Sequence, residues 1–324
     1  MPATGSNRMP LAANPLNATA SVSAWKESKA FSDKTPRLLG TSSIPTHQPG
    51  PSKHLPLPFL RPDPAKRARV IVAILSPTMA AKLPYTLDDA RVERLPPAVY
   101  YIPDFITGDE EQAILHKIAD APKPRWKQLT HRRLQTWPSD LVNNKLLQAP
   151  LPSWLEAPII SRLLSLPRSQ QDTNNVFSES PHKRPNHVLI NEYPPGIGIM
   201  PHKDGPAYHP VVCTVSLGAS LCLNLYKSKD DGALDPEPIW RILQEPRSLL
   251  ITTETLYTDY LHGIADIEED VDLSAETVAN WELLRSPESL SAGRNVRATR
   301  TSLTYRDVMQ VSQLGAKFGM FGKR

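Results

Sequence analysis

Hydrophobic and polar residues alternate with a period of two in several stretches of the chain, which is the pattern of half-buried β-strands. One stretch, residues 187–193, carries on a single face His187, Leu189, Asn191 and Tyr193. Another, residues 300–306, carries on a single face Arg300, Ser302, Thr304 and Arg306. Two further β-rich runs, residues 211–217 and 221–226, are separated by only three small residues, so we predict that they pair as a hairpin.

Helical periodicity is confined to two segments. Thr107 and Glu110 have the spacing of a capping box, and the helix that they open places Ile114, Leu115 and Ile118 on its core face. A second helical piece is expected around residues 159–166, inside the otherwise loop-rich region 148–185. A short strand is expected at residues 100–102. Together these patterns predict a mainly β fold with flanking helices, an α+β arrangement.

Charge divides the chain into two parts. Residues 1–86 hold 11 Lys and Arg against 3 Asp and Glu, whereas the remaining residues hold 26 against 30. The first part also contains 13 of the 34 prolines and has no sustained period. We therefore predict a disordered, basic, Pro/Ser-rich tail over residues 1–86 and a folded domain over residues 87–324. Within that domain residues 266–290 are acidic, and we expect them to form a surface insert that would repel a phosphate backbone.

The cysteines and the apolar runs indicate the cellular compartment and whether the chain associates with a membrane. Cys213 and Cys222 both lie inside predicted strands, so we expect small buried hydrophobes in a reducing compartment rather than a disulfide framework. The apolar run at residues 70–75 is too short to cross a bilayer, and no signal peptide opens the chain. No membrane association is therefore expected.

A basic cluster in the tail has two interpretations. Lys66, Arg67 and Arg69 could contact nucleic acid or act as a localisation signal, or they could belong to a solvated linker. We expect a nuclear and cytoplasmic protein. A mitochondrial presequence is less well supported, because Arg8 is the only basic residue before Lys26.

Three residues have the chemistry of a metal site. His202 and Asp204 are two apart, which puts both side chains on one face of an extended segment, and His262 follows sixty residues later. Two imidazoles and one carboxylate are the ligands of non-haem iron(II) oxygenases, in which the remaining coordination positions stay open. His-x-Asp alone is more often a surface turn, so the prediction depends on all three residues.

The order of these motifs resembles the AlkB family of iron(II)- and 2-oxoglutarate-dependent dioxygenases. That family carries Asn-x-Tyr, His-x-Asp, a distant His and Arg-x5-Arg, which match Asn191 and Tyr193, His202 and Asp204, His262, and Arg300 and Arg306. The resemblance implies a double-stranded β-helix, or jelly-roll, dioxygenase core. It also implies Fe(II) as the metal, with 2-oxoglutarate and O2 as co-substrates. Many family members have Asn where this chain has Ser302, which concerns a secondary contact to the co-substrate.

The resemblance also assigns residues to 2-oxoglutarate. Arg300 would hold its far carboxylate with Tyr193, and Asn191 would hold the end nearer the metal. Arg306 would serve the metal-proximal end, and its alternative is a salt bridge at the rim. Leu189 and Ser302 complete the expected co-substrate site.

A substrate region is expected at residues 131–137. Arg132, Arg133 and Trp137 combine guanidinium groups with an aromatic face, which suits phosphates and a stacked base, and the alternative is an exposed loop whose Trp packs locally. The expected activity is oxidative demethylation of an N-alkylated base, with single-stranded DNA or RNA as the partner. The alternatives are a protein side-chain hydroxylase or demethylase, and a non-catalytic nucleic-acid-binding or scaffold protein with a vestigial metal pocket.

Overall fold

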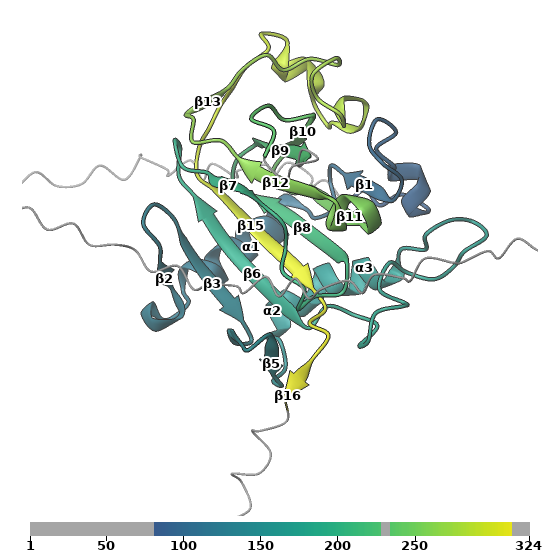
Figure 1. Cartoon of the computed structure of the whole chain (residues 1–324), viewed down its shortest axis with the longest axis vertical. Helices are drawn as coiled ribbons and strands as arrows, with labels where there is room; N and C mark the ends of the chain where they lie inside the picture. Colours follow the sequence, from purple (N-terminus) through teal and green to yellow (C-terminus); the bar gives the residue numbers. More distant parts are fainter. Residues whose placement is uncertain (1–80, 228–233, 313–324) are drawn as a thin grey trace, which may run out of the picture. The chain divides into compact units, whose positions relative to one another are not determined.

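Residues 81–227 and 234–312 are described by a computed structural model of the chain, in which two β-sheets face each other (Figure 1). The predicted tail lies outside these residues except for 81–86. The side chain of Leu87 is completely buried in the first helical turn, η1 (Leu87–Ala90).

Both sheets are antiparallel throughout. The larger has the strand order β1-β11-β8-β15-β6-β3-β2, and the smaller has the order β10-β9-β12-β7. The larger sheet consists of β1 (Val99–Ile102), β2 (Lys127–Gln128), β3 (Arg133–Trp137), β6 (His187–Tyr193), β8 (Val211–Leu217), β11 (Leu249–Thr253) and β15 (Arg300–Arg306). The smaller sheet consists of β7 (Ile199–His202), β9 (Leu221–Lys227), β10 (Trp240–Gln244) and β12 (Tyr260–Ile264).

Eight of these strands form a double-stranded β-helix. The chain crosses between the sheets repeatedly, so that β6, β8, β11 and β15 lie in the larger sheet while β7, β9, β10 and β12 lie in the smaller one. Inward-facing side chains of both sheets line the space between them, as in other jelly rolls. The predicted fold class is confirmed, and so are the predicted strands at residues 187–193 and 300–306.

The predicted hairpin of residues 211–217 and 221–226 is wrong. Strand β8 pairs with β11 and β15, whereas β9 pairs with β10 and β12 in the other sheet. The intervening turn carries the chain from one sheet to the other instead of returning it along the same sheet. Gly218 has φ +84° in this turn, and a Cβ there would lie 2.7 Å from the Thr299 carbonyl oxygen, so the crossing requires glycine.

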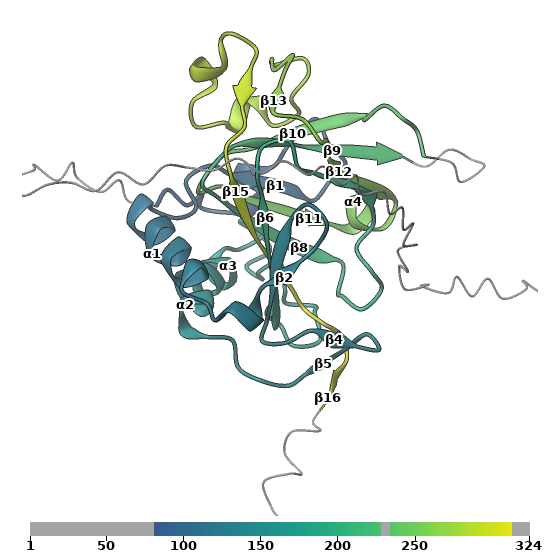
Figure 2. The same cartoon turned by 90° about the vertical axis from the view of Figure 1, so that its left-hand side faces the viewer.

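Helices cover the outer face of the larger sheet (Figure 2). They are α1 (Gly108–Ala119), α2 (Ser153–Leu155) and α3 (Ser161–Ser165), with the π-turn η3 (Glu156–Ile160) between the last two. The predicted capping box is confirmed, because the Glu110 amide donates to Thr107 Oγ1 at 3.2 Å and the Thr107 amide donates to Glu110 Oε2 at 2.8 Å. Ile114 and Ile118 pack against the sheet in the main core.

The acidic segment 266–290 is not only a surface insert. It contains β13 (Glu269–Asp270), which pairs with β14 (Asn295–Val296), and the 3-10 turns η4 (Trp281–Leu283) and η5 (Pro287–Leu290). Its apolar residues join a second core with the smaller sheet, and those buried there are Leu273, Val278, Ala279, Leu284 and Leu290. Asp270 is 1% exposed and forms a two-bond ion pair with Arg297, at 2.7 and 3.0 Å. The charge pattern predicted a surface segment because it reports only the acidic residues. The apolar residues of the segment pack it against the smaller sheet.

The remaining elements lie outside the two main sheets. A three-stranded sheet has the order β16-β5-β4, and its members are β4 (Leu141–Val142), β5 (Lys145–Leu147) and β16 (Val311–Ser312). The short helix α4 (Glu254–Thr258) follows β11, and the 3-10 turn η2 (Lys123–Arg125) precedes β2. Both cysteines are free and buried, as expected. In the described part of the chain, no helix combines the length and apolar character needed to span a bilayer.

Candidate active site

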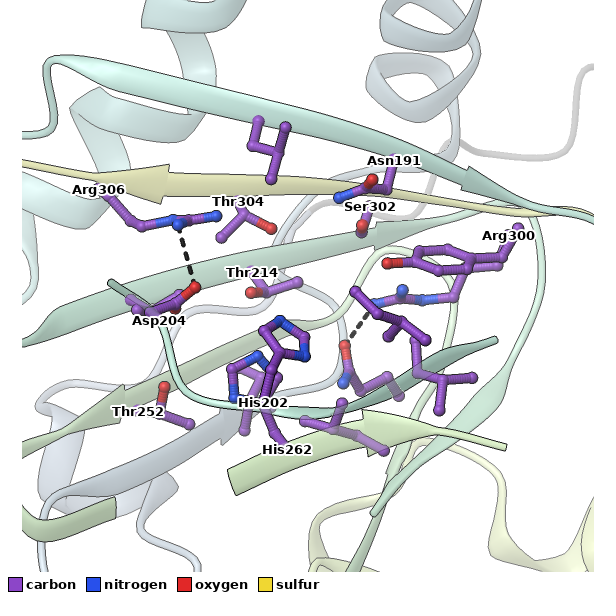
Figure 3. Close-up of a pocket in the computed structure, with 18 of the residues that line it drawn as sticks. Asn191, His202, Asp204, Thr214, Thr252, His262, Arg300, Ser302, Thr304 and Arg306 are labelled. Atoms are coloured by element: carbon purple, nitrogen blue, oxygen red, sulfur yellow. Dashed lines mark hydrogen bonds and ion pairs between the residues drawn. The ribbon is translucent and has the colours of Figure 1, made fainter. Parts of the chain in front are cut away.

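A cavity of about 320 Å³ lies between the two sheets and opens among polar side chains from both (Figure 3). Alternate residues of β6 and β15 face into this cavity. They are Leu189, Asn191 and Tyr193 on β6, and Arg300, Ser302, Thr304 and Arg306 on β15. Strand alternation explains this selection, because successive side chains point to opposite faces of a sheet. Every residue predicted for the metal and for 2-oxoglutarate lines this one cavity.

The three predicted metal ligands come together at one end of the cavity. His202 on β7 is the direct cross-strand partner of His262 on β12, and their ring centroids are 4.4 Å apart. One donor atom each from His202, Asp204 and His262 lie within 4.8 Å of one another. Strands β7 and β12 can approach this closely because Gly198 has no side chain: a Cβ there would lie 2.0 Å from the Ile264 carbonyl oxygen.

Hydrogen bonds orient these side chains. His202 Nδ1 lies 2.9 Å from the Met200 carbonyl oxygen, and since a carbonyl can only accept, Nδ1 donates this hydrogen bond and Nε2 is the nitrogen that faces a metal. Burial lowers the pKa of His262 to about 4, so this imidazole is neutral at physiological pH. Asp204 Oδ1 accepts from Arg306 Nη1 at 3.0 Å, which leaves Oδ2 available.

The loop that carries Asp204 is tied to helix α4. Lys203 Nζ donates to the Thr258 carbonyl oxygen at 2.7 Å, and the Tyr257 hydroxyl donates to the Gly205 carbonyl oxygen at 3.0 Å. On the other side the Tyr208 ring lies against Arg306, with the guanidinium carbon 4.4 Å from the ring centroid. These contacts hold the carboxylate next to the two imidazoles.

The opposite end of the cavity holds a buried cation. Arg300 is 2% exposed and its polar contacts are neutral: Ser216, Gln244 and the ring of its cross-strand partner Tyr193. Burial lowers the pKa of Arg300 to about 10, so the group is still charged at physiological pH. Because a buried charge without a counter-charge is costly, this end of the cavity is suited to an anion.

The polar atoms left without partners also fit a polar ligand. Within the described residues, Asn191 Oδ1, Arg132 Nε and Arg306 Nε are buried and lack a hydrogen-bond partner, and all three residues line the cavity. Two imidazoles and a carboxylate suit Fe(II), and the cationic far end suits a dicarboxylate. The residues present therefore fit an iron ion with 2-oxoglutarate.

The three predicted substrate residues do not act as one group. Arg132 lines the cavity, as does Leu134, whose partner on β6 is Asn191. Arg133 and Trp137, which alternate with Leu134 along β3, are absent from the cavity wall.

Arg133 and Trp137 have structural partners instead. Arg133 donates to both Glu192 carboxylate oxygens, at 2.6 and 2.9 Å, and stacks on Trp126. The Trp137 ring packs edge-on against Trp154 with centroids 5.6 Å apart, and Arg125 covers its face at 4.0 Å. The prediction that Trp137 offers a free stacking face is corrected, because a strand sends alternate side chains to opposite faces. Its alternative, local packing of the Trp, holds.

Sequence reasoning missed two residues of the site, Ser216 and Gln244. Both are completely or almost completely buried, at 0% and 1% exposure. Their only signal is a polar side chain within an apolar strand, at positions that reach Arg300 only once β8, β10 and β15 have been assembled.

A second cavity, of about 770 Å³, lies where β15 ends. It is lined by the basic residues Lys145, His182 and Arg184. Arg184 is paired with Glu156 and His182 with Asp307, so among these three described residues Lys145 is the one without an ion-pair partner. The chain after β15 is hydrogen-bonded to the segment that follows Asp204: the Met309 amide donates to the Ala207 carbonyl at 2.9 Å, and the His209 amide to the Asp307 carbonyl at 2.8 Å. We call this second cavity the basic groove. Met309 in its lining is three residues from Arg306, which lines the metal end of the first cavity.

Comparison with known proteins agrees with this geometry. The profile of the 2OG-Fe(II) oxygenase superfamily matches residues 98–306. Over 227 residues the chain is 39% identical to a Danio rerio protein named "Probable RNA/DNA demethylase ALKBH6", and the alignment covers 68% of this chain and 89% of that protein. The chain belongs to the AlkB family of the 2OG-Fe(II) oxygenases. It is therefore an Fe(II)-dependent dioxygenase that uses 2-oxoglutarate and O2, so the expected enzyme class and co-substrates are confirmed.

More distant relatives cover a similar region. The Xenopus tropicalis tRNA (carboxymethyluridine(34)-5-O)-methyltransferase alkbh8 is 27% identical over 219 residues, which are 66% of this chain and 32% of that protein. Among solved structures, that of OsALKBH1 aligns with a TM-score of 0.42 and 15% identity over 66% of this chain and 98% of that one. The jelly-roll assignment of this chain rests on the strand order described above.

Proposed function

We propose that this AlkB-family chain removes N-alkyl groups from nucleic-acid bases by oxidation, with iron held by His202, Asp204 and His262. The observation that carries the proposal is a single cavity with these three donors within 4.8 Å of one another at one end and the uncompensated cation Arg300 at the other. The family supplies the chemistry: Fe(II) with 2-oxoglutarate and O2 hydroxylates a substrate C–H bond, and an N-hydroxymethyl group then leaves as formaldehyde.

The residues of this chain position the reactants. Arg300 binds the far carboxylate of 2-oxoglutarate, with the Tyr193 hydroxyl beside it, and Asn191 faces the end nearer the metal. Leu189 and Ser302 form part of the same wall.

Arg306 acts through Asp204. Its hydrogen bond orients the ligand carboxylate, and its buried Nε remains for a polar group of the bound co-substrate. Along the strand Arg300 and Arg306 are about 20 Å apart, at roughly 3.3 Å per residue, so the two arginines serve different groups.

Nucleic acid is the proposed substrate class for two reasons. The Danio rerio relative is named as an RNA/DNA demethylase, and the basic groove lies near the metal end of the cavity. Lys145, which has no ion-pair partner among the described residues, is the cation of this groove that is available to a phosphate of a strand whose base enters the cavity. Because a base in a duplex must first be unstacked and flipped, at a cost of a few kcal/mol, single strands should be preferred.

Turnover assays would test this proposal directly. Purified, iron-loaded protein is offered single-stranded and duplex oligonucleotides with defined N-methyl bases, together with methylated histone peptides, and succinate and formaldehyde are measured. We expect formaldehyde to be released with single strands. Release with peptides alone would replace the nucleic-acid substrate by a protein side chain and leave the dioxygenase assignment in place.

A further inference from the structure

One edge of the Arg300 guanidinium is already occupied by the protein. Its Nε and Nη2 donate to Ser216 Oγ at 3.3 and 2.8 Å, and Nη2 also donates to Gln244 Oε1 at 2.5 Å. A guanidinium has five N–H donors, of which these contacts use three. The remaining two are both on Nη1, which has no partner among the described residues.

This occupation changes how Arg300 can hold a carboxylate. Arginine commonly binds the two oxygens of a carboxylate with two nitrogens. Here one nitrogen is left, so a carboxylate at this end of the cavity needs a second donor for its other oxygen.

Gln244 is oriented to supply that donor. The Arg300 guanidinium has no acceptor, so the atom of the Gln244 amide that faces it must be the oxygen. Ser216 Oγ lies 3.1 Å from the same oxygen and fixes the amide further. The amide nitrogen of Gln244 is consequently turned away from Arg300, and its two N–H groups have no partner among the described residues. Gln244 lines the cavity and is 1% exposed.

We propose that Gln244 is a second hydrogen-bond donor to the far carboxylate of 2-oxoglutarate, with its amide nitrogen donating alongside Arg300 Nη1. Ser216 is the positioning residue that aligns the Arg300 and Gln244 side chains. The inference rests on the proposed binding of 2-oxoglutarate at Arg300. A carboxylate has about four lone-pair sites, so the Tyr193 hydroxyl can donate to the same group. A neutral amide supplies direction without a second buried charge, whose desolvation would be costly.

Binding measurements on full-length, Mn(II)-loaded protein test the assignment without turnover. Isothermal titration compares 2-oxoglutarate with 2-oxovalerate, which has the same chain length but ends in a methyl group. For Gln244→Leu we expect the Kd for 2-oxoglutarate to rise roughly tenfold or more, because a hydrogen bond to a charged group is lost, and the Kd for 2-oxovalerate to stay within about twofold. Ser216→Ala should raise the Kd for 2-oxoglutarate less, because it keeps the Gln244 donor.

Thr252→Val is the matched control. Thr252 lines the same cavity but lies away from Arg300 in Figure 3, so its removal should leave the Kd for 2-oxoglutarate unchanged. Circular dichroism melting checks the fold of each variant. If Gln244→Leu does not fold, Gln244→Asn retains the amide but withdraws it by one methylene, and the same selective loss is expected.

The outcomes separate this inference from the proposed function. An unchanged Kd for 2-oxoglutarate in Gln244→Leu, or an equal loss for both 2-oxo acids, would overturn the role of Gln244. A wild-type protein that binds neither acid, or that binds both equally well, would instead overturn the placement of 2-oxoglutarate at Arg300.

Discussion

His202 and His262 are sixty positions apart in the sequence and directly opposite each other on strands β7 and β12. Cross-strand partners have Cβ atoms about 5 Å apart, so this register alone brings two imidazoles within reach of one ion. The return of the chain to the smaller sheet at β12 therefore creates the metal end of the cavity, and Asp204 completes it from the loop after β7.

Removal of a metal donor should abolish metal binding. We expect Asp204→Asn and His262→Ala to lose stoichiometric binding of Fe(II) or Mn(II), because three donors are required to hold the ion on one side. Equilibrium dialysis with metal analysis measures this. His116→Ala is the control, since His116 is an exposed histidine on α1, with 75% of its side chain accessible. Full stoichiometry in either site variant would show that the ligands have been wrongly assigned.

Arg300→Lys should damage co-substrate binding more than metal binding. A lysine ammonium has three donors on one atom and cannot bond Ser216 and Gln244 while also reaching the far carboxylate. We expect the KM for 2-oxoglutarate to rise severalfold or more while Mn(II) stoichiometry stays near that of the wild type. An unchanged KM would move the carboxylate site elsewhere in the cavity.

The basic groove should contribute salt-dependent binding of single strands. Lys145 is exposed and has no ion-pair partner among the described residues, so Lys145→Glu changes charge without breaking a contact. We expect severalfold weaker binding of single-stranded oligonucleotides and a shallower salt dependence, because fewer counterions are released. Fluorescence anisotropy at two salt concentrations measures both quantities.

Lys117→Glu, on helix α1, is the control for this change. Equal losses in the two variants would mean that net charge rather than the groove governs binding. Turnover of 2-oxoglutarate without substrate should be the same in both, since neither residue lines the first cavity.

Arg132→Ala and Trp137→Ala should have different consequences. Arg132 lines the cavity, so its loss should lower turnover of a methylated substrate with little change in stability. Trp137 packs on Trp154 and under Arg125, so its truncation should cost about 3 kcal/mol of unfolding free energy, as for other large-to-small core substitutions. Urea unfolding and demethylation rates distinguish the two. A stable Trp137→Ala protein with impaired substrate binding would restore the stacking role first predicted for this residue.

The buried Asp270–Arg297 pair should hold the acidic segment to the chain that leads into β15. Breaking a buried ion pair leaves an uncompensated charge, so Asp270→Ala should destabilise the fold by about 3–5 kcal/mol. The neighbouring Glu269 pairs with an Arg294 side chain that is 61% exposed, so Glu269→Ala should cost about 0–1 kcal/mol. Denaturant unfolding of both variants measures the difference, and similar losses would argue against a special role for the buried pair.

The features that depend on local order could be predicted from the amino-acid sequence. Strand alternation predicted β6 and β15, and the Thr107–Glu110 spacing predicted the start of α1, because period and capping are properties of neighbouring residues. The spacing of His202, Asp204, His262, Arg300 and Arg306 also sufficed to predict the family, since chemistry requires those residue types in that order.

Which residues meet depends on how the strands are assembled into sheets, and this could not be predicted from local order. The turn at Gly218 can serve a hairpin or a crossing between sheets, and the choice depends on partners for β8 and β9 that lie far away in the sequence. Likewise, Ser216 and Gln244 become neighbours of Arg300 only when three strands from two sheets are assembled. Pairing across a sheet and packing between sheets are set by long-range contacts, and these contacts place the polar side chains that surround the ligand.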